Sequence, residues 1–280
     1  MSTNTLSISV CYDIQDYMKY IFSISYPMNP HAVLLIGDGC TPMGQRKFAN
    51  FNEYHSKDID FFNSFYTHAS MLDPVYNKFC FTRWFYIKNY AIRHNYDKVF
   101  AYDTDVMILS DVNTIIDKYK SYEFCQNKGS GHTAIFNIDV LKEFCDFLLF
   151  FARKGYKKHA ALLAKSLEEN PSMFGGVSDM DAVSDFYDVY SGSKKSDPLG
   201  LSHNITDEPG YVKKKELGIV EIFIKNGNIF LLSEDDGAFV RFDTLHFQGS
   251  SKQFVAPFYK FFYANKNTNV YTSFTQWLGV

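Results

Sequence analysis

The most constraining feature of the sequence is an apolar run, residues 99–109, that is interrupted by two carboxylates, Asp103 and Asp105. Residues two apart in a strand point to the same side, so both carboxylates converge if residues 99–102 form a buried strand. Two buried carboxylates repel each other, and both lose their hydration. A hard divalent cation such as Mg²⁺ or Mn²⁺ relieves both costs. The alternative is that one Asp caps the next turn while the other faces water.

The composition limits the class of protein. The chain has 280 residues, of which 46% are hydrophobic, which suits one large α/β domain and argues against disorder. The net charge is −3 without a long basic run, so no nucleic-acid partner is expected. We find no apolar stretch of about 18 residues and no signal peptide. We therefore expect no membrane span and a cytoplasmic protein, while peripheral membrane contact stays open.

The cysteines are consistent with a cytoplasmic protein. Their number is odd and no two have CxxC spacing, so neither a disulfide framework nor a zinc site is indicated. We expect buried, reduced thiols. The five cysteines are Cys11, Cys40, Cys80, Cys125 and Cys145.

Hydrophobic periodicity predicts an α/β chain, because short apolar runs between turn residues indicate buried strands and helical spacing alternates with them. We expect strands at residues 6–11, 32–39, 99–102, 106–109, 124–126 and 133–137. We expect helices at residues 17–24, 60–71, 78–94, 111–116, 140–151, 157–167, 181–190 and 258–263. Runs at 220–224, 228–232 and 238–242 predict antiparallel strands with a hairpin turn at residues 225–228, and residues 41–58 read as irregular.

A second motif lies near the end of the chain, where His246, Gly249 and Lys252 follow one another at intervals of three. A neutral His246 can serve as a third metal ligand beside the two carboxylates. Gly249 allows the backbone to approach a diphosphate closely, and Lys252 can place a cation on a phosphate. The alternative for this stretch alone is a strand end followed by a surface lysine.

Together the two motifs resemble those of GT-A-fold glycosyltransferases of family 8, which include bacterial lipopolysaccharide galactosyl- and glucosyltransferases and glycogenin. The resemblance combines a DxD motif after an apolar strand with a late HxxGxxK motif and spans most of the chain. The matched residues, in the order of the family, are Asp13, Arg83, Asp103, Asp105, Asn137, Asp179, Asp181, His246, Gly249 and Lys252.

The resemblance implies a metal-dependent hexosyltransferase that uses a nucleotide sugar, with UDP as the expected nucleotide. Mn²⁺ or Mg²⁺ held by Asp103, Asp105 and His246 would neutralise the charge on the leaving diphosphate. Asp13 would accept from the uracil ring, on which Tyr12 would stack. Asp13, Asp103 and Asn137 would all lie beyond the carboxyl ends of the strands, where ligands bind in open α/β sheets. The nucleotide-sugar-binding residues implied in this way are Tyr12, Asp13, Arg83, Asp103, Thr104, Asn137, Gly249 and Lys252.

The catalytic residues implied by the resemblance are Asp179, Asp181 and Arg83. A retaining reaction, in which the leaving phosphate itself takes the proton, is the expectation. An inverting reaction with Asp179 or Asp181 as the general base is the alternative. The acceptor would be a glycan, a lipid-linked saccharide or a protein hydroxyl. The segment 175–209 and the aromatic C-terminal part are the expected acceptor contacts.

The resemblance also implies a GT-A architecture, with a mixed, mainly parallel central sheet flanked by helices, a small antiparallel hairpin and an irregular C-terminal part. We expect a single catalytic domain over residues 1–280. Its nucleotide-binding half would comprise residues 1–140, and residues 141–280 would form the acceptor-binding half and the C-terminal closure.

The chain departs from the family pattern at three places. Gln253 and Phe254 stand where the family has Pro-Trp, and Asp139 replaces a glycine. Met180 occupies the middle of the motif that reads Asp-Gln-Asp in the family. A thioether cannot act as a general base, so the mechanism carries over less well than donor binding.

Other interpretations stay open. A sugar nucleotidyltransferase would carry a glycine-rich, basic loop after the first strand, and residues 11–17 have neither glycine nor base. A non-catalytic nucleotide-sugar-binding protein would tolerate Met180. Each of four site residues also has a purely structural alternative: Asp13 or Asp179 as a helix cap, Arg83 in a pair with a surface acid, and Asn137 as a turn residue.

Overall fold

We describe a computed structural model of the chain, in two compact units that we treat one at a time. The described residues are 4–37, 47–127, 130–169, 176–190, 195–196, 203–204, 210–214 and 216–279. The first unit comprises Met1–Asp13, Val33–Tyr102 and Tyr119–Pro198. The second comprises Ile14–Ala32, Asp103–Lys118 and Leu199–Val280. Both units therefore draw on both predicted halves of the chain, and a single catalytic domain divided at residue 140 stays a prediction.

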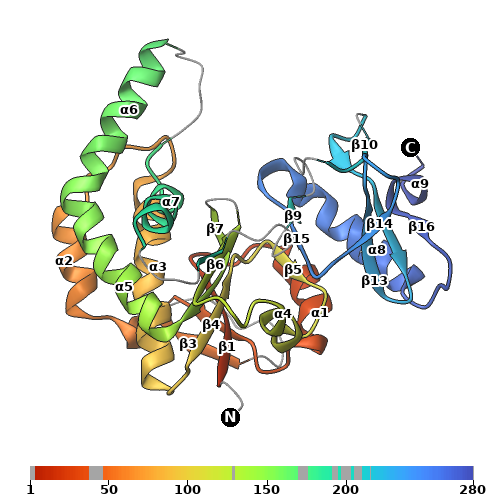
Figure 1. Cartoon of the computed structure of the whole chain (residues 1–280), viewed down its shortest axis with the longest axis horizontal. Coiled ribbons are helices and arrows are strands. Elements are labelled where there is room, and N and C mark those ends of the chain that lie inside the picture. The colour runs from red at the N-terminus through yellow and green to blue at the C-terminus, as the bar shows by residue number, and fades with distance from the viewer. Residues whose placement is uncertain are drawn as a thin grey trace. The chain divides into compact units, whose positions relative to one another are not determined.

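The first unit is built on a seven-stranded sheet with the order β3-β2-β1-β4-β7-β6-β8. Figure 1 labels β1, β3, β4, β6 and β7 of this sheet. The strands are β1 Thr5–Cys11, β2 Val33–Ile36, β3 Lys47–Asn50, β4 Lys98–Tyr102, β6 Phe124–Asn127, β7 Ser130–Asn137 and β8 Lys195–Ser196. The four strands from β3 to β4 are parallel, β7 is antiparallel to both its neighbours, and β8 is parallel to β6. The expected mixed, mainly parallel central sheet is confirmed.

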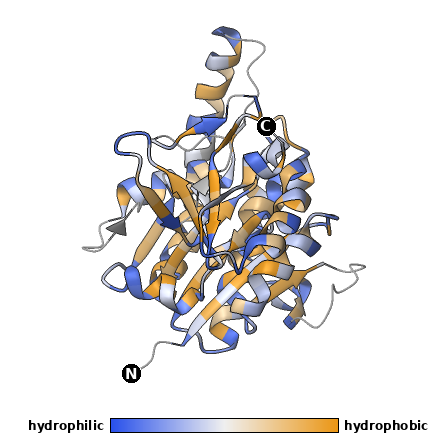
Figure 2. Cartoon of the chain, turned by 90° about the vertical axis from the view of Figure 1, so that its right-hand side faces the viewer, coloured by the Kyte–Doolittle hydropathy of each residue, from blue (hydrophilic) through white to orange (hydrophobic). Residues whose placement is uncertain are grey.

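The apolar runs that predicted these strands are buried. β2 and β4 are buried along their whole length, and β1 and β7 nearly so, which is typical of strands covered on both faces. The strands of the sheet are mostly hydrophobic in Figure 2. The helices and turns of this unit are η1 Phe51–Tyr54, α2 Lys57–Phe65, α3 Pro74–Arg93, α5 Ile138–Phe150, the π-helical turn η2 Phe151–Gly155, α6 Tyr156–Glu169 and α7 Asp179–Val189.

The central helix of the first unit, α3, begins where the sequence favours it. Asp73 caps it by accepting hydrogen bonds from the backbone N–H groups of Val75 and Tyr76, at 3.0 and 2.9 Å, and Pro74 occupies its first turn. Its middle packs Phe81, Trp84 and Phe85 into the core. These anchors fix the position of Arg83, which lies between them in the sequence.

The expectation of irregular structure at residues 41–58 is wrong for its second part. β3 adds a fourth parallel strand to the sheet, and η1 and the start of α2 follow it. β3 is an edge strand whose residues are only partly buried or exposed, so no buried alternation marked it in the sequence. Cys40 and residues 41–46 lie outside the described residues, as do residues 175, 191–194, 197–202 and 205–209 of the segment 175–209.

The second unit holds the remaining elements. Its helices are α1 Met18–Met28, α4 Val112–Lys118, the 3₁₀ turn η3 Gly249–Phe254, α8 Val255–Asn265 and α9 Phe274–Trp277. β5 Val106–Ile108, β15 Thr244–His246 and β9 His203–Asn204 form one sheet. β14 Phe239–Phe242, β13 Asn228–Leu232, β12 Ile222–Lys225 and β16 Thr272–Ser273 form another, and β10 Lys213–Lys214 pairs with β11 Ile219–Val220.

The hairpin between β12 and β13 is confirmed as antiparallel, with Lys225 paired to Asn228. Its two turn residues, Asn226 and Gly227, have φ angles of 50° and 72°. Positive φ at both central positions is the geometry that an Asn-Gly turn favours. No helix among the described residues is long and apolar enough to cross a membrane.

Candidate functional site

In the second unit, a tight turn places the two carboxylates of the DxD motif directly before β5. The carbonyl of Asp103 accepts a hydrogen bond from the N–H of Val106 at 3.0 Å. β5 pairs antiparallel with β15, and Val106 lies opposite His246. The pairing extends by one bond, from the N–H of Phe247 to the carbonyl of Asp105 at 3.0 Å. Asp105 and His246 are thus neighbours across this ladder although 140 residues lie between them.

Helix α1 holds this ladder in place. The hydroxyl of Ser25 accepts from the N–H of Ile108, and the side-chain carbonyl of Asn29 accepts from the N–H of Val112, both at 2.8 Å. These bonds satisfy backbone groups where β5 ends and α4 begins. The backbone that follows the two carboxylates is therefore held by Ser25 of α1 and by Asn29, the residue that ends this helix.

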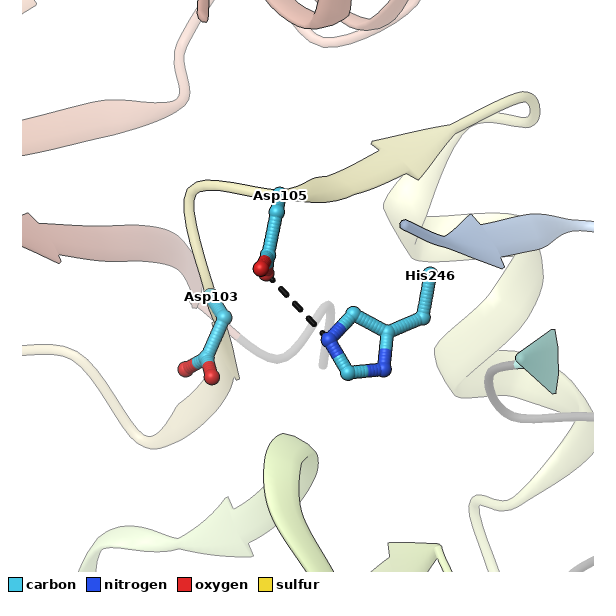
Figure 3. A group of neighbouring side chains, drawn as sticks. All are labelled: Asp103, Asp105 and His246. Carbon is cyan, nitrogen blue, oxygen red and sulfur yellow. Dashed lines mark ion pairs between the residues drawn. The ribbon is translucent and has the colours of Figure 1, made fainter. Parts of the chain in front are cut away.

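The three side chains face a common space (Figure 3). One ligand atom from each of Asp103, Asp105 and His246 can be chosen so that all lie within 4.8 Å of one another. Nε2 of His246 lies 3.3 Å from Oδ1 of Asp105. Asp105 is 8% exposed and His246 3% exposed. The second unit thus brings together two carboxylates and an imidazole, as the sequence predicted.

Lys252 reaches the same carboxylate from η3. Its Nζ lies 2.9 Å from Oδ2 of Asp105 and 5.5 Å from the centre of the Tyr17 ring. η3 opens at Gly249, whose φ of 57° lies in the left-handed region, where a side chain is disfavoured. The glycine of this motif therefore shapes the turn that carries Lys252, and nothing lies within 4 Å of where its Cβ would be.

The pKa of Asp105 reflects two opposing effects. Burial raises the pKa, but the close contacts with His246 and Lys252 outweigh it and hold the pKa at about 2. The carboxylate is therefore charged at neutral pH despite its burial. Its Oδ1 is buried and accepts no well-formed hydrogen bond. A charged, buried oxygen that accepts no well-formed hydrogen bond fits a site for a divalent cation, and two carboxylates with one imidazole form a donor set that suits Mn²⁺ or Mg²⁺.

In the first unit, Arg83 and Asp179 form an ion pair. Nη2 of Arg83 donates to Oδ2 of Asp179 at 2.8 Å, and Nε1 of Trp84 donates to the same oxygen at 3.0 Å. Arg83 also donates to the carbonyl of Gly131 at 3.4 Å. The side chain of Asp179 is buried, and that of Arg83 is partly buried at 13% exposure. Arg83 therefore pairs with an acid, and that acid is buried rather than on the surface.

Asp181 is engaged at the start of α7. It closes a capping box in which its Oδ2 accepts from the N–H of Ser178 at 2.8 Å. Its other oxygen lies 3.6 Å from Nδ1 of His159. Ser178 is the N-cap, so Asp179 is the first residue of the helix rather than its cap. Met180, between the two aspartates, is exposed.

The residues expected to hold the nucleotide base follow β1 in the first unit. Tyr12 is exposed and packs its ring against Tyr76 and Phe79 of α3, at centroid distances of 6.0 and 5.1 Å. Asp13 is exposed, and its carbonyl accepts from the thiol of Cys11 at 3.0 Å. Thr104 is partly buried in the second unit, between the two carboxylates of the DxD motif. The locations of these three residues are thus known, whereas their nucleotide-binding roles stay predictions.

Asn137 does not lie where the sequence analysis placed it. β7 is antiparallel to β4, so Asn137 lies opposite Lys98 at the amino end of β4, whereas Thr133 lies opposite Tyr102 at the carboxyl end. The expectation that Asn137 follows a strand at the carboxyl edge of the sheet, beside the residues after β1 and β4, is therefore wrong. A strand's own sequence does not reveal its direction in a mixed sheet.

The start of β7 carries polar residues that the sequence analysis missed. The hydroxyl of Ser130 lies 2.5 Å from Nδ1 of His132, and Nδ2 of Asn127 lies 3.3 Å from Nε2 of the same ring. Ser130 also lies 3.5 Å from the sulfur of Met180. A serine and a histidine two residues apart on one strand were the available signal, since they share a face.

Comparison with known proteins gives weak likenesses only. No protein-family model and no curated protein matches the chain. A glycosyltransferase involved in glycosylating the major capsid of PBCV-1 matches at 8% identity with a TM-score of 0.42, over 90% of this chain and 98% of that one. Mouse xyloside xylosyltransferase 1 in its apo form matches at 8% identity with a TM-score of 0.45, over 73% and 88%.

A cytidylyltransferase from Leptospira borgpetersenii serovar Hardjo-bovis matches at 9% identity with a TM-score of 0.34, over 62% of this chain and 74% of that one. Two of these three structures are thus glycosyltransferases and one transfers a nucleotidyl group. At such identities and TM-scores the likenesses assign neither a family nor an activity to this chain.

Proposed function

We propose that the chain is a metal-dependent glycosyltransferase that moves a sugar from a nucleotide sugar to an acceptor hydroxyl. The observation that carries the proposal is the convergence of Asp103, Asp105, His246 and Lys252, which come from the two motifs of the sequence. A cation site with an adjacent ammonium group suits a substrate whose leaving group is a diphosphate, because that group needs positive charge as it departs.

Each residue of the second-unit site has a role in this proposal. Asp103, Asp105 and His246 hold Mn²⁺ or Mg²⁺, which supplies positive charge to the diphosphate when bound. Lys252 is 37% exposed at its side chain, so its ammonium group is accessible to a phosphate oxygen as well as to Asp105. Gly249 provides the turn that sets Lys252 beside the carboxylates.

The finer assignment rests on the resemblance to family 8. UDP is the proposed nucleotide, with Asp13 reading the uracil ring and Tyr12 stacking on it. Arg83, which is held by Asp179, is the proposed group that orients the diphosphate or a hydroxyl of the donor sugar, because a planar guanidinium suits both. The acceptor is a glycan, a lipid-linked saccharide or a protein hydroxyl.

The proposal is tested by a donor screen with purified protein and Mn²⁺. We expect one nucleotide sugar to be hydrolysed slowly without acceptor, and the reaction to stop when EDTA removes the cation. A parallel assay for pyrophosphate release from nucleoside triphosphates and sugar 1-phosphates identifies a nucleotidyltransferase. Pyrophosphate release without hydrolysis of any nucleotide sugar would reject the glycosyltransferase proposal.

A further inference from the structure

Positive charge is concentrated in one segment of the first unit. Residues 147–167 hold five Lys and Arg side chains and no Asp or Glu, although the net charge of the whole chain is −3. Arg153, Lys154, Lys157 and Lys158 are exposed. Basic clusters of this kind at an amphipathic helix attract anionic surfaces. The segment therefore carries a charge opposite in sign to that of the protein as a whole.

The π-helical turn η2 explains why these side chains point outward. Phe151, its first residue, is buried in the core of the first unit. A Cβ at Gly155, its last residue, would lie 2.7 Å from the Phe151 ring, so the glycine lets the turn close over that ring. Arg153 and Lys154, between these two residues, are left exposed. The turn thus presents two adjacent cations to solvent, and π-helical turns are frequent at functional sites.

Exposed aromatic rings surround the two cations of η2. The guanidinium of Arg153 lies 5.8 and 5.3 Å from the ring centres of Phe61 and Phe65 on α2. Nζ of Lys154 lies 5.6 Å from the ring centre of Phe150 at the end of α5. Phe61 and Phe65 are each 41% exposed, and Phe150 is 52% exposed. Because α2 contacts both α5 and η2 (Figure 1), the cations and the rings share one surface of the first unit.

A hollow of about 340 Å³ lies beside Phe150. Its lining includes four apolar side chains and two lysines, namely Phe147, Phe150, Phe151, Val189, Lys154 and Lys158. Leu162, one helical turn after Lys158 on α6, is exposed as well. Apolar surface next to ammonium groups matches the chemistry of a lipid, whose phosphate is charged and whose chains are apolar.

The acidic residues around this surface are dispersed over three helices. Asp185 and Asp188 on α7 line the hollow, and Oδ2 of Asp185 lies 2.8 Å from Nε2 of His159 on α6. Asp146 precedes Phe150 by one turn of α5, and Asp60 on α2 lies 2.8 Å from Nε2 of His55. The four exposed cations, in contrast, all lie within residues 153–158. The local field at η2 and the start of α6 is therefore positive.

We propose that this surface of the first unit attaches the protein to membranes that contain anionic lipids. We call it the basic aromatic surface, and it consists of Phe61, Phe65, Phe150, Arg153, Lys154 and Lys158. The lipid phosphates meet the three cations, while the phenyl rings and the hollow receive apolar parts of the lipid. A nucleic acid would also meet the cations, but the aliphatic side chains of Leu162 and Val189 cannot stack on its bases. The inference goes beyond the proposed function and does not depend on it.

The first test is cosedimentation of the full chain with vesicles of phosphatidylcholine, prepared with and without the anionic lipid phosphatidylglycerol. We expect binding to the anionic vesicles to be about tenfold or more tighter than to phosphatidylcholine alone, and to weaken as salt is added. Equal binding to both vesicle types, or binding to neither, would overturn the proposal. Tighter binding to a single-stranded oligonucleotide than to the anionic vesicles would also overturn it.

A charge variant tests whether the basic aromatic surface makes the contact. Each Lys or Arg close to an anionic membrane strengthens binding about fivefold, so Lys154→Gln/Lys158→Gln should bind the anionic vesicles about 25-fold more weakly. Lys120→Gln/Lys142→Gln is the matched control, because it removes the same charge from exposed residues of the first unit outside this surface. We expect the control to bind like the parent, and equal weakening in both variants would overturn the proposal.

An aromatic variant tests the apolar part of the contact. Phe150→Ser should weaken binding to the anionic vesicles about tenfold or more, since the phenyl ring no longer enters the lipid. Ile92→Ser is the control, because Ile92 is also exposed but lies near the end of α3. Both changes affect exposed side chains, and thermal unfolding verifies that each variant is folded. Parental affinity in Phe150→Ser would overturn the assignment of this surface. No nucleotide sugar enters these assays, so their outcome is independent of that of the donor screen.

Discussion

Each unit of the molecule buries an aspartate beside a cation, and the two aspartates differ in how their oxygens are used. Asp179 in the first unit receives hydrogen bonds from Arg83 and Trp84 on one oxygen. Asp105 in the second unit contacts Lys252 and His246, yet its buried Oδ1 accepts no well-formed hydrogen bond. Asp103 lies close enough to Asp105 and His246 for the three side chains to bind one cation. A buried ion pair alone does not indicate a binding site. A carboxylate that lacks a hydrogen bond and lies within a cluster of potential metal ligands favours one.

The largest expected effect lies in the first unit, on stability. Asp179→Ala leaves the partly buried guanidinium of Arg83 without its carboxylate, and breaking one partner of a buried pair costs about 3–5 kcal/mol. Urea denaturation measures the loss. The double variant Asp179→Ala/Arg83→Met should recover part of it. A single variant as stable as the parent would contradict the interpretation of this pair as structural.

The second effect is on activity, in the second unit. Asp105→Asn removes the charge of a proposed metal ligand while it keeps the shape of the side chain, so we expect kcat/KM to fall about 100-fold or more. Asp111→Asn is the matched control, because Asp111 is exposed and only caps α4, a role that asparagine fills equally well. A loss of the same size in both variants would place the effect outside the metal site.

The third effect is a pH dependence of the free energy of unfolding, which arises from Asp105. Its folded-state pKa of about 2 lies below its ordinary value of 3.8. The lowered pKa stabilises the folded state by about 2 kcal/mol. This stabilisation is complete above the pKa of the unfolded state and is lost as the pH falls through the pKa of the folded state. Denaturation in EDTA between about pH 5 and pH 2, the range that those two pKa values set, measures this loss. Asp105→Asn should remove this part of the slope, and an unchanged slope would contradict the contacts described for Asp105.

The smallest effect concerns the turn that carries Lys252. Gly249→Ala meets no neighbouring atom, so its cost is the backbone strain of a positive φ, about 1 kcal/mol. We expect a small decrease in thermal stability, and a weaker affinity for UDP if the turn shifts Lys252. Gly237→Ala is the control, since Gly237 also has a positive φ and open surroundings but lies in another loop of the second unit. A weaker affinity for UDP in both variants would argue against a specific role of the turn.

Much of the site in the second unit could be predicted because its residues lie in motifs. Asp103 and Asp105 follow an apolar strand, and His246, Gly249 and Lys252 keep a fixed spacing, so side-chain chemistry alone suggested a cation and a phosphate. The confirmed sheet followed from the apolar runs of β1, β2, β4, β6 and β7.

The structural predictions were wrong where they depend on the direction of a strand or on the pairing of an edge strand. Asn137 was misplaced because β7 is antiparallel to β4, and β3 was missed because an edge strand shows little burial. Ser130 and His132 were missed because their hydrogen bond depends on rotamers at the start of β7 that periodicity does not report.

The central claim is that Asp103, Asp105 and His246 form a site for a divalent cation. Titration calorimetry of Mn²⁺ into the EDTA-treated protein, with and without UDP, tests it most directly. We expect saturable binding of Mn²⁺ that tightens in the presence of UDP, and loss of both signals in Asp105→Asn but not in Asp111→Asn. Binding of Mn²⁺ by Asp105→Asn with the affinity of the parent would contradict the claim.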